Sequence, residues 1–156
     1  MYRIGYAPGA FDLFHIGHLN LLRQAKEQCE FLIAGVAADE VLIEHKGVTP
    51  TIPLAERLEI VRNVRFVDSA IAATTIDKVE IWRTLQFDVL FKGDDWQGVD
   101  KSLRLEREFS ALGVDVVYFS YCAVTSSSAL RRTFRSIDSY ADICMSTAYE
   151  IHRQVA

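Results

Sequence analysis

Cysteine is scarce in this chain and is not arranged to form a cross-linked or metal-bound framework. The three cysteines, Cys29, Cys122 and Cys144, lie far apart, and none belongs to a CxxC pair. An odd count with this spacing argues against a disulfide scaffold and against a zinc knuckle. We therefore expect buried, reduced thiols in a cytoplasmic protein.

Long apolar runs and an excess of positive charge are also missing. The longest apolar stretch, residues 31–38, is far short of the roughly 20 residues that cross a bilayer. Residues 1–6 lack the basic-then-apolar pattern of a signal peptide. The 17 Lys and Arg residues are outnumbered by 21 Asp and Glu residues, which gives a formal net charge of −4. We expect no membrane and no nucleic acid among the partners, although a local cluster of donors can still bind a small phosphate ligand.

The composition is that of one globular domain with a sizeable core. Of the 156 residues, 50% are hydrophobic and 24% are charged. Strand patterns are predicted over 2–7, 31–37, 66–73, 89–92 and 114–119. Helical patterns are predicted over 17–27, 54–65, 77–85, 101–112 and 126–135, with N-caps at Asp77 and Ser126 and a loop over 41–53.

Five strands separated by helices indicate an α/β fold, namely a Rossmann-like, doubly wound, five-stranded parallel sheet. We assign residues 1–135 to this single domain. An apolar stripe over 140–155 predicts an extra C-terminal helix, so residues 136–156 form an extension that packs on the core or on a dimer partner.

Ligands of such sheets bind beyond the carboxyl ends of the strands. The segments that follow the predicted strands are therefore the candidate site. They are 9–12, Lys46-Gly47, 92–96 and 125–128.

Two histidines open the first predicted helix, directly after a turn of small residues. His15 and His18 are three residues apart and so share one face of the first turn. Helix N-termini present unpaired N–H groups and a positive dipole, which suit phosphate, and Gly17 lets a large ligand approach the backbone. A metal site would need a third ligand at a suitable spacing, and none follows. The pattern therefore favours phosphate binding.

The stretch from Gly9 to Leu19, Gly-Ala-Phe-Asp-Leu-Phe-His-Ile-Gly-His-Leu, resembles the HxGH signature of the nucleotidylyltransferases in its cytidylyltransferase form, GxFDxxHxGH. Residues 91–98 are similar to the KGDDWxG stretch of glycerol-3-phosphate cytidylyltransferases. Lys46, Arg57 and Arg65 fall where that family has basic residues, and residues 65–68 match its R-[YF]-V-D element. The resemblance covers about residues 2–132.

The resemblance implies transfer of CMP from CTP to a small phosphorylated alcohol, which yields a CDP-alcohol and pyrophosphate. It also implies Mg²⁺ as cofactor and a homodimer. The implied catalytic residues are His15, His18 and Lys46. The implied nucleotide-binding residues are Gly9, Ala10, Phe11, Asp12, Gly17, Arg65, Lys92, Gly93, Asp94, Trp96, Thr125, Ser126 and Ser127. The Mg²⁺ is expected to arrive on the triphosphate, with Asp12 as a candidate to help hold it or to orient the acceptor.

One block departs from the family. The cytidylyltransferases have R-T-x-G-I-S-T before their last core helix, whereas residues 121–127 read Tyr-Cys-Ala-Val-Thr-Ser-Ser. One expected cation is therefore absent, and Arg131 or Arg132 is the candidate replacement. The serine-rich ending also resembles that of adenylyltransferases, so ATP is the alternative nucleotide, and a non-catalytic nucleotide-binding protein is a third reading. The HIGH spelling of residues 15–18 is shared with aminoacyl-tRNA synthetases, but this chain is short, acidic and without their Lys-Met-Ser-Lys-Ser loop.

Overall fold

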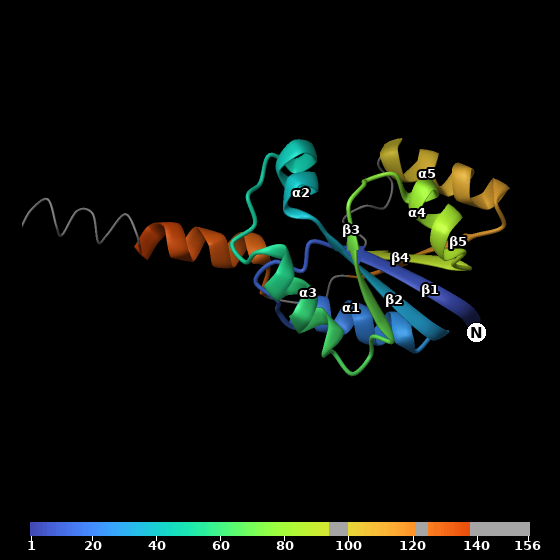
Figure 1. Ribbon diagram of the computed structural model, residues 1–156, viewed down its shortest axis with the longest axis horizontal. Helices are drawn as coiled ribbons and strands as arrows, with labels where there is room; N and C mark the ends of the chain where they lie inside the picture. Colours follow the sequence, from blue (N-terminus) through green and yellow to red (C-terminus); the bar gives the residue numbers. More distant parts are fainter. Residues whose placement is uncertain (94–99, 121–124, 138–156) are drawn as a thin grey trace, which may run out of the picture.

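Parallel strands and helices alternate along the chain in the computed structural model, which describes residues 1–93, 100–120 and 125–137 (Figure 1). The elements are β1 (Tyr2–Gly9), α1 (Ile16–Lys26), β2 (Cys29–Ala37), α2 (Asp39–Lys46), α3 (Leu54–Arg62), β3 (Ser69–Ala73), α4 (Lys78–Leu85), β4 (Val89–Gly93), α5 (Asp100–Ala111) and β5 (Asp115–Phe119). A further helix covers 127–137. The strands form one sheet in the order β3-β2-β1-β4-β5, and every pairing is parallel. The predicted fold is confirmed.

Helices cover both faces of this sheet (Figure 1). On one face, α1 and α3 bury Leu22, Ala25 and Val61 against β1 and β2. On the other face, α4 and α5 bury Ile81 and Phe109. This two-sided burial explains why β4 is buried at every residue, Lys92 included.

The direction in which the chain adds strands to the sheet reverses between β3 and β4, so the switch point lies between β1 and β4. The chain moves outward from β1 through β2 to β3 and then returns to place β4 on the other side of β1. The junction is short, because β1 pairs with β4 only at Gly5–Val89 and Tyr6–Leu90, whereas its pairing with β2 runs from Tyr2–Cys29 to Gly9–Val36. Ligands of doubly wound sheets bind at this reversal, and the turn after β1 lies there.

The loop predicted over 41–53 is wrong in its first half, because α2 occupies Asp39–Lys46. Asp39 and Glu40 in the first turn and Lys46 in the last turn complement the helix dipole. Gly47 ends the helix in the left-handed conformation at φ 61° and donates its N–H to Ile43. The Lys46-Gly47 pair is therefore a helix C-cap and not the middle of a loop.

Strand β3 begins at Ser69 and not at residue 66 as predicted. The intervening residues form a turn in which the Val67 N–H donates to the Val64 carbonyl. The predicted N-caps are confirmed: the Asp77 carboxylate accepts from Val79 and Glu80, and the Ser126 hydroxyl accepts from Ala129.

The predicted extension at 136–156 lies outside the described residues except for its first two, which continue the helix at 127–137. Within the described ranges, no helix combines the length and the apolarity that crossing a membrane requires.

Candidate active site

The two signature histidines cap helix α1 reciprocally. The His15 ring accepts the Gly17 N–H at Nδ1, at 3.0 Å, and the His18 ring accepts the His15 backbone N–H at Nδ1, at 3.4 Å. A neutral imidazole that accepts at Nδ1 carries its proton at Nε2. Each ring therefore has Nε2–H as its donor, and a phosphate oxygen is an acceptor for such a donor.

The two rings are stacked and electrically neutral at pH 7. Their centroids are 4.0 Å apart with an interplanar angle of 28°, and the rings of Phe11 and Phe14 lie within 5.5 Å of His18. Burial lowers the pKa of His15. Burial, together with the neighbouring His15, lowers the pKa of His18 to about 3, although Asp12 acts in the opposite direction.

The turn before these histidines has an unusual backbone. Phe11 and Leu13 have φ angles of 52° and 49°, in the left-handed region that side chains with a Cβ rarely adopt. Asp12 stands between them and is only 2% exposed. Such conformations persist where surrounding contacts hold them, and they concentrate at functional sites.

Asp12 provides those contacts. Its carboxylate accepts the N–H of Thr51 at 3.1 Å and of Ile52 at 2.9 Å, and the Arg131 guanidinium at 2.7 Å. Burial raises the pKa of Asp12, but the two amides and Arg131 outweigh it and lower this pKa below its ordinary value. Asp12 is therefore an ionised anchor whose carboxylate accepts from two backbone amides and one guanidinium, and its predicted part in holding Mg²⁺ or orienting the acceptor stays a prediction. The described residues also contain no group of three His, Cys, Asp or Glu side chains placed to hold a metal.

Arg57 holds the same turn from inside the protein. Its side chain is fully buried, donates through Nε to the Ile52 carbonyl at 2.8 Å, and also donates to the Ala10 carbonyl and the Asp39 carboxylate. Arg57 is one of the basic residues that the family resemblance singled out. It is neither an exposed charge nor a side chain with spare donors at the surface, because it cross-links α3, the turn and the start of α2.

Lys46 is exposed at the end of α2. Its positive charge is close enough to act on the pKa of a second lysine, Lys78. Burial, together with the nearby Lys46, lowers the pKa of Lys78 to about 8. Lys78 is the first residue of α4 and follows β3, so it also lies at the carboxyl edge of the sheet. Sequence reasoning missed Lys78, although its place directly after a strand and a capping Asp77 was a usable signal.

The serine-rich helix at 127–137 is tied to the signature turn. The Ser127 hydroxyl donates to the Asp12 carbonyl at 2.7 Å, and Arg131 forms the ion pair with the Asp12 carboxylate. Figure 1 shows this helix, in orange-red, beside the loop that joins α2 to α3. Arg132 is exposed. Of the two arginines predicted to supply the missing cation, Arg131 is therefore the one that the structure brings to the site.

The remaining predicted residues divide into three groups. The first group lies at the site, either in or next to the segments just described or at the end of the buried strand β4, which neighbours β1. Its members are Gly9, Ala10, Gly17, Thr125, Ser126, Lys92 and Gly93. Arg65 is exposed, stacks on Phe66 and precedes β3, so it lies at the opposite, amino edge of the sheet and is not brought to the site. Asp94, Trp96, Tyr121 and Cys122 lie outside the described residues.

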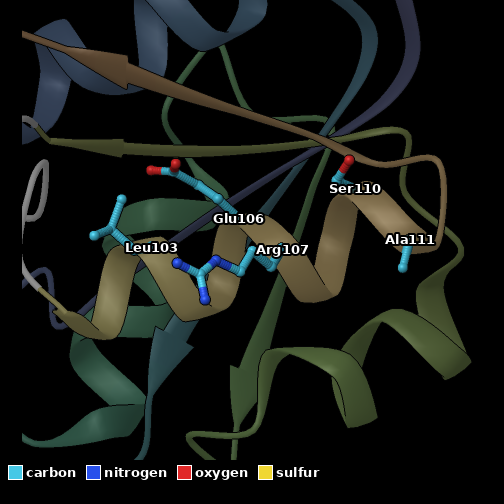
Figure 2. Close-up of a pocket in the computed structure, with 5 residues that line it drawn as sticks. All are labelled: Leu103, Glu106, Arg107, Ser110 and Ala111. Atoms are coloured by element: carbon cyan, nitrogen blue, oxygen red, sulfur yellow. The ribbon is translucent and has the colours of Figure 1, made fainter.

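A surface groove runs along α5, away from the signature turn. Figure 2 shows that a single helix supplies its lining side chains, which are Leu103, Glu106, Arg107, Ser110 and Ala111. Glu106 is engaged by the Tyr118 hydroxyl at 2.8 Å. The groove contains none of the residues of the candidate site.

Comparisons with known proteins agree with this arrangement. The cytidylyltransferase-like family model matches residues 6–133. An FAD synthase from Pyrococcus abyssi is 32% identical over 114 residues, which cover 72% of this chain and 77% of that protein. An ethanolamine-phosphate cytidylyltransferase from Arabidopsis thaliana is 40% identical over 95 residues, which cover 58% of this chain but only 22% of that protein.

Solved structures share the fold. The crystal structure of a lipopolysaccharide core biosynthesis protein from Thermoplasma volcanium superposes with a TM-score of 0.66 at 25% identity. The superposition covers 80% of this chain and 100% of that one.

Proposed function

Because this chain belongs to the cytidylyltransferase-like family, we propose that it transfers CMP from CTP to a small phosphorylated alcohol, giving a CDP-alcohol and pyrophosphate. The acceptor belongs to the class of glycerol 3-phosphate, other polyol phosphates and related phosphates or phosphonates. Membership of the family supports nucleotidyl transfer, and the choice of CTP and of the acceptor is our proposal.

The observation that carries this proposal is the reciprocal capping of α1 by His15 and His18. It fixes two neutral imidazoles as Nε2–H donors at a helix N-terminus, next to the switch point of the strand order. A site built of fixed donors suits a reaction in which negative charge moves between phosphate groups.

The reaction needs little beyond positioning and charge. An oxygen of the acceptor phosphate attacks the α-phosphorus of the nucleotide, one new P–O bond forms, and the bond to the bridging oxygen of the β-phosphate breaks as pyrophosphate leaves. The acceptor is already an anion near pH 7, so no general base is required. In this proposal His15 and His18 donate to the phosphate oxygens that gain charge, while Lys46 and Arg131 offset the repulsion between the two anions.

Magnesium enters this proposal as part of the nucleotide substrate. The Asp12 oxygens accept from Thr51, Ile52 and Arg131, and the described residues contain no group of three His, Cys, Asp or Glu side chains placed to hold a metal. The Mg²⁺–nucleotide complex would neutralise charge on the leaving group, and the chain's own residues would orient it. The homodimer implied by the family resemblance remains a prediction that light scattering of the purified chain can check.

Adenylyl transfer is a second candidate, and two observations favour it. FAD synthases are among the relatives, and FAD contains an adenylyl group. The serine helix, whose sequence resembles the serine-rich ending of adenylyltransferases, also brings Arg131 to the signature turn. CTP remains our first choice because residues 92–98 match the cytidylyltransferases.

The test is calorimetric titration with CTP, ATP, GTP and UTP, each with Mg²⁺, followed by pyrophosphate release with a panel of phosphorylated alcohols and FMN. Selective binding of CTP and release with an alcohol phosphate would support the proposal. Preference for ATP would replace it with the adenylyl candidate. Absence of binding to all four nucleotides would refute both and favour a non-catalytic role.

A further inference from the structure

Three segments that are far apart in sequence meet at one buried carboxylate. The turn at 10–14 contributes Asp12 itself, the loop at 47–53 contributes the N–H groups of Thr51 and Ile52, and the helix at 127–137 contributes Arg131. The Asp12 backbone carbonyl adds a second link to that helix by accepting the Ser127 hydroxyl.

Each of these segments carries a group that the proposed reaction uses. The turn leads into His15, the loop begins directly after Lys46, and the helix carries the Arg131 cation. Arg57 also holds this loop through the Ile52 carbonyl, while Val48 and Thr49, which follow the Gly47 cap, are exposed. The ionised Asp12 side chain therefore joins the loop that follows the exposed Lys46 to the helix that carries Arg131.

We infer that Asp12 is a positioning residue that couples the Lys46 loop to the Arg131 helix, and that it is neither a metal ligand nor a direct contact of the substrate. The inference rests on the proposed function for the roles of Lys46 and Arg131. The coupling itself is a property of the free protein, and it can be tested without any nucleotide.

The decisive measurement is amide hydrogen exchange of Thr51 and Ile52, followed by NMR in the wild-type protein and in Asp12→Asn. We expect exchange at both amides to become at least about tenfold faster in the variant, because each loses a charge-assisted acceptor. Asp68→Asn is the matched control. The Asp68 carboxylate also accepts one backbone amide, from Leu32, and one cation, from Lys26, but at the opposite edge of the sheet. It should leave Thr51 and Ile52 unchanged.

Arg131→Gln tests the coupling even if Asp12→Asn fails to fold. Losing the guanidinium should speed exchange at Thr51 and Ile52 although Arg131 touches neither, and Arg131→Lys, which keeps the charge, should retain most of the protection. Unchanged exchange at both amides in Arg131→Gln would overturn the inference.

Kinetics separate positioning from metal binding. If Asp12 couples the two cations, Asp12→Asn should lower kcat by about tenfold or more, leave the Mg²⁺ concentration for half-maximal rate unchanged, and make a further Arg131→Gln change nearly without effect. Recovery of the Asp12→Asn rate at high Mg²⁺ would overturn the inference in favour of a metal ligand. Failure of the proposed function would appear differently, as absence of turnover in the wild-type protein with the exchange result intact.

Discussion

Replacing His18 by two residues of different reach separates its capping role from its proposed catalytic role. In His18→Asn the short amide can still accept the His15 N–H, but nothing remains at the position of Nε2. In His18→Gln an amide N–H can occupy the position of Nε2. Removing one donor to a developing oxyanion costs about 10²–10³-fold in kcat. We therefore expect His18→Asn to lose at least 10²-fold in kcat, with a thermal midpoint close to that of the wild type, and His18→Gln to lose much less.

The assay is steady-state pyrophosphate release at saturating nucleotide and acceptor, with thermal unfolding of the same samples. Near-wild-type kcat in His18→Asn would refute the role of the Nε2–H donor. Loss of both kcat and stability in His18→Gln, with both retained in His18→Asn, would show that His18 acts only as a helix cap.

The remaining predictions concern stability and the placement of Lys46. Because burial and His15 hold the folded pKa of His18 near 3, the unfolded chain binds a proton between about pH 6.5 and 3 that the folded protein does not. The free energy of unfolding should therefore fall by about 1–2 kcal/mol between pH 7.5 and 5, a slope that urea titrations should find reduced in His18→Gln. Tyr6→Phe should raise the free energy of unfolding by about 1 kcal/mol, since the buried hydroxyl has no hydrogen-bond partner among the described residues; a loss of similar size would contradict this. Gly47→Ala and Gly113→Ala should each cost about 1 kcal/mol, because both positions have positive φ and open space around Cβ. Only Gly47→Ala, next to Lys46, should also lower kcat. An equal loss of kcat in Gly113→Ala would contradict the proposed place of Lys46 in the active site.

Local patterns predicted most of the fold. The apolar runs of the strands, the caps at Asp77 and Ser126 and the helix that starts beside His15 depend on residues close together in sequence, so they can be read from it. Helix α2 was missed because two short-range signals, Gly47 and the nearby prolines, were interpreted as a loop when they mark the end of the helix and the segment after it.

The site was predicted less completely, for physical reasons. Arg57 finds its partners in Ala10, Asp39 and a backbone carbonyl of Ile52, and no spacing rule connects these positions. Arg65 was placed in the site by resemblance alone. Since it precedes a strand, the topology of a parallel sheet puts it at the amino edge, and that deduction was open to sequence reasoning.

The short junction between β1 and β4 also bears on how the chain folds as it is synthesised. Strands β1, β2 and β3 are complete by Ala73, and together with α1 and α3 they supply most of the core on one side of the sheet. The partners of the other side come later, in α4 and α5. A nascent chain can thus form a three-stranded intermediate whose second side, with Tyr6 and Ile33 on it, stays open to solvent until α5 emerges from the ribosome. Exposed apolar surface of this kind is what makes partly folded chains prone to aggregation.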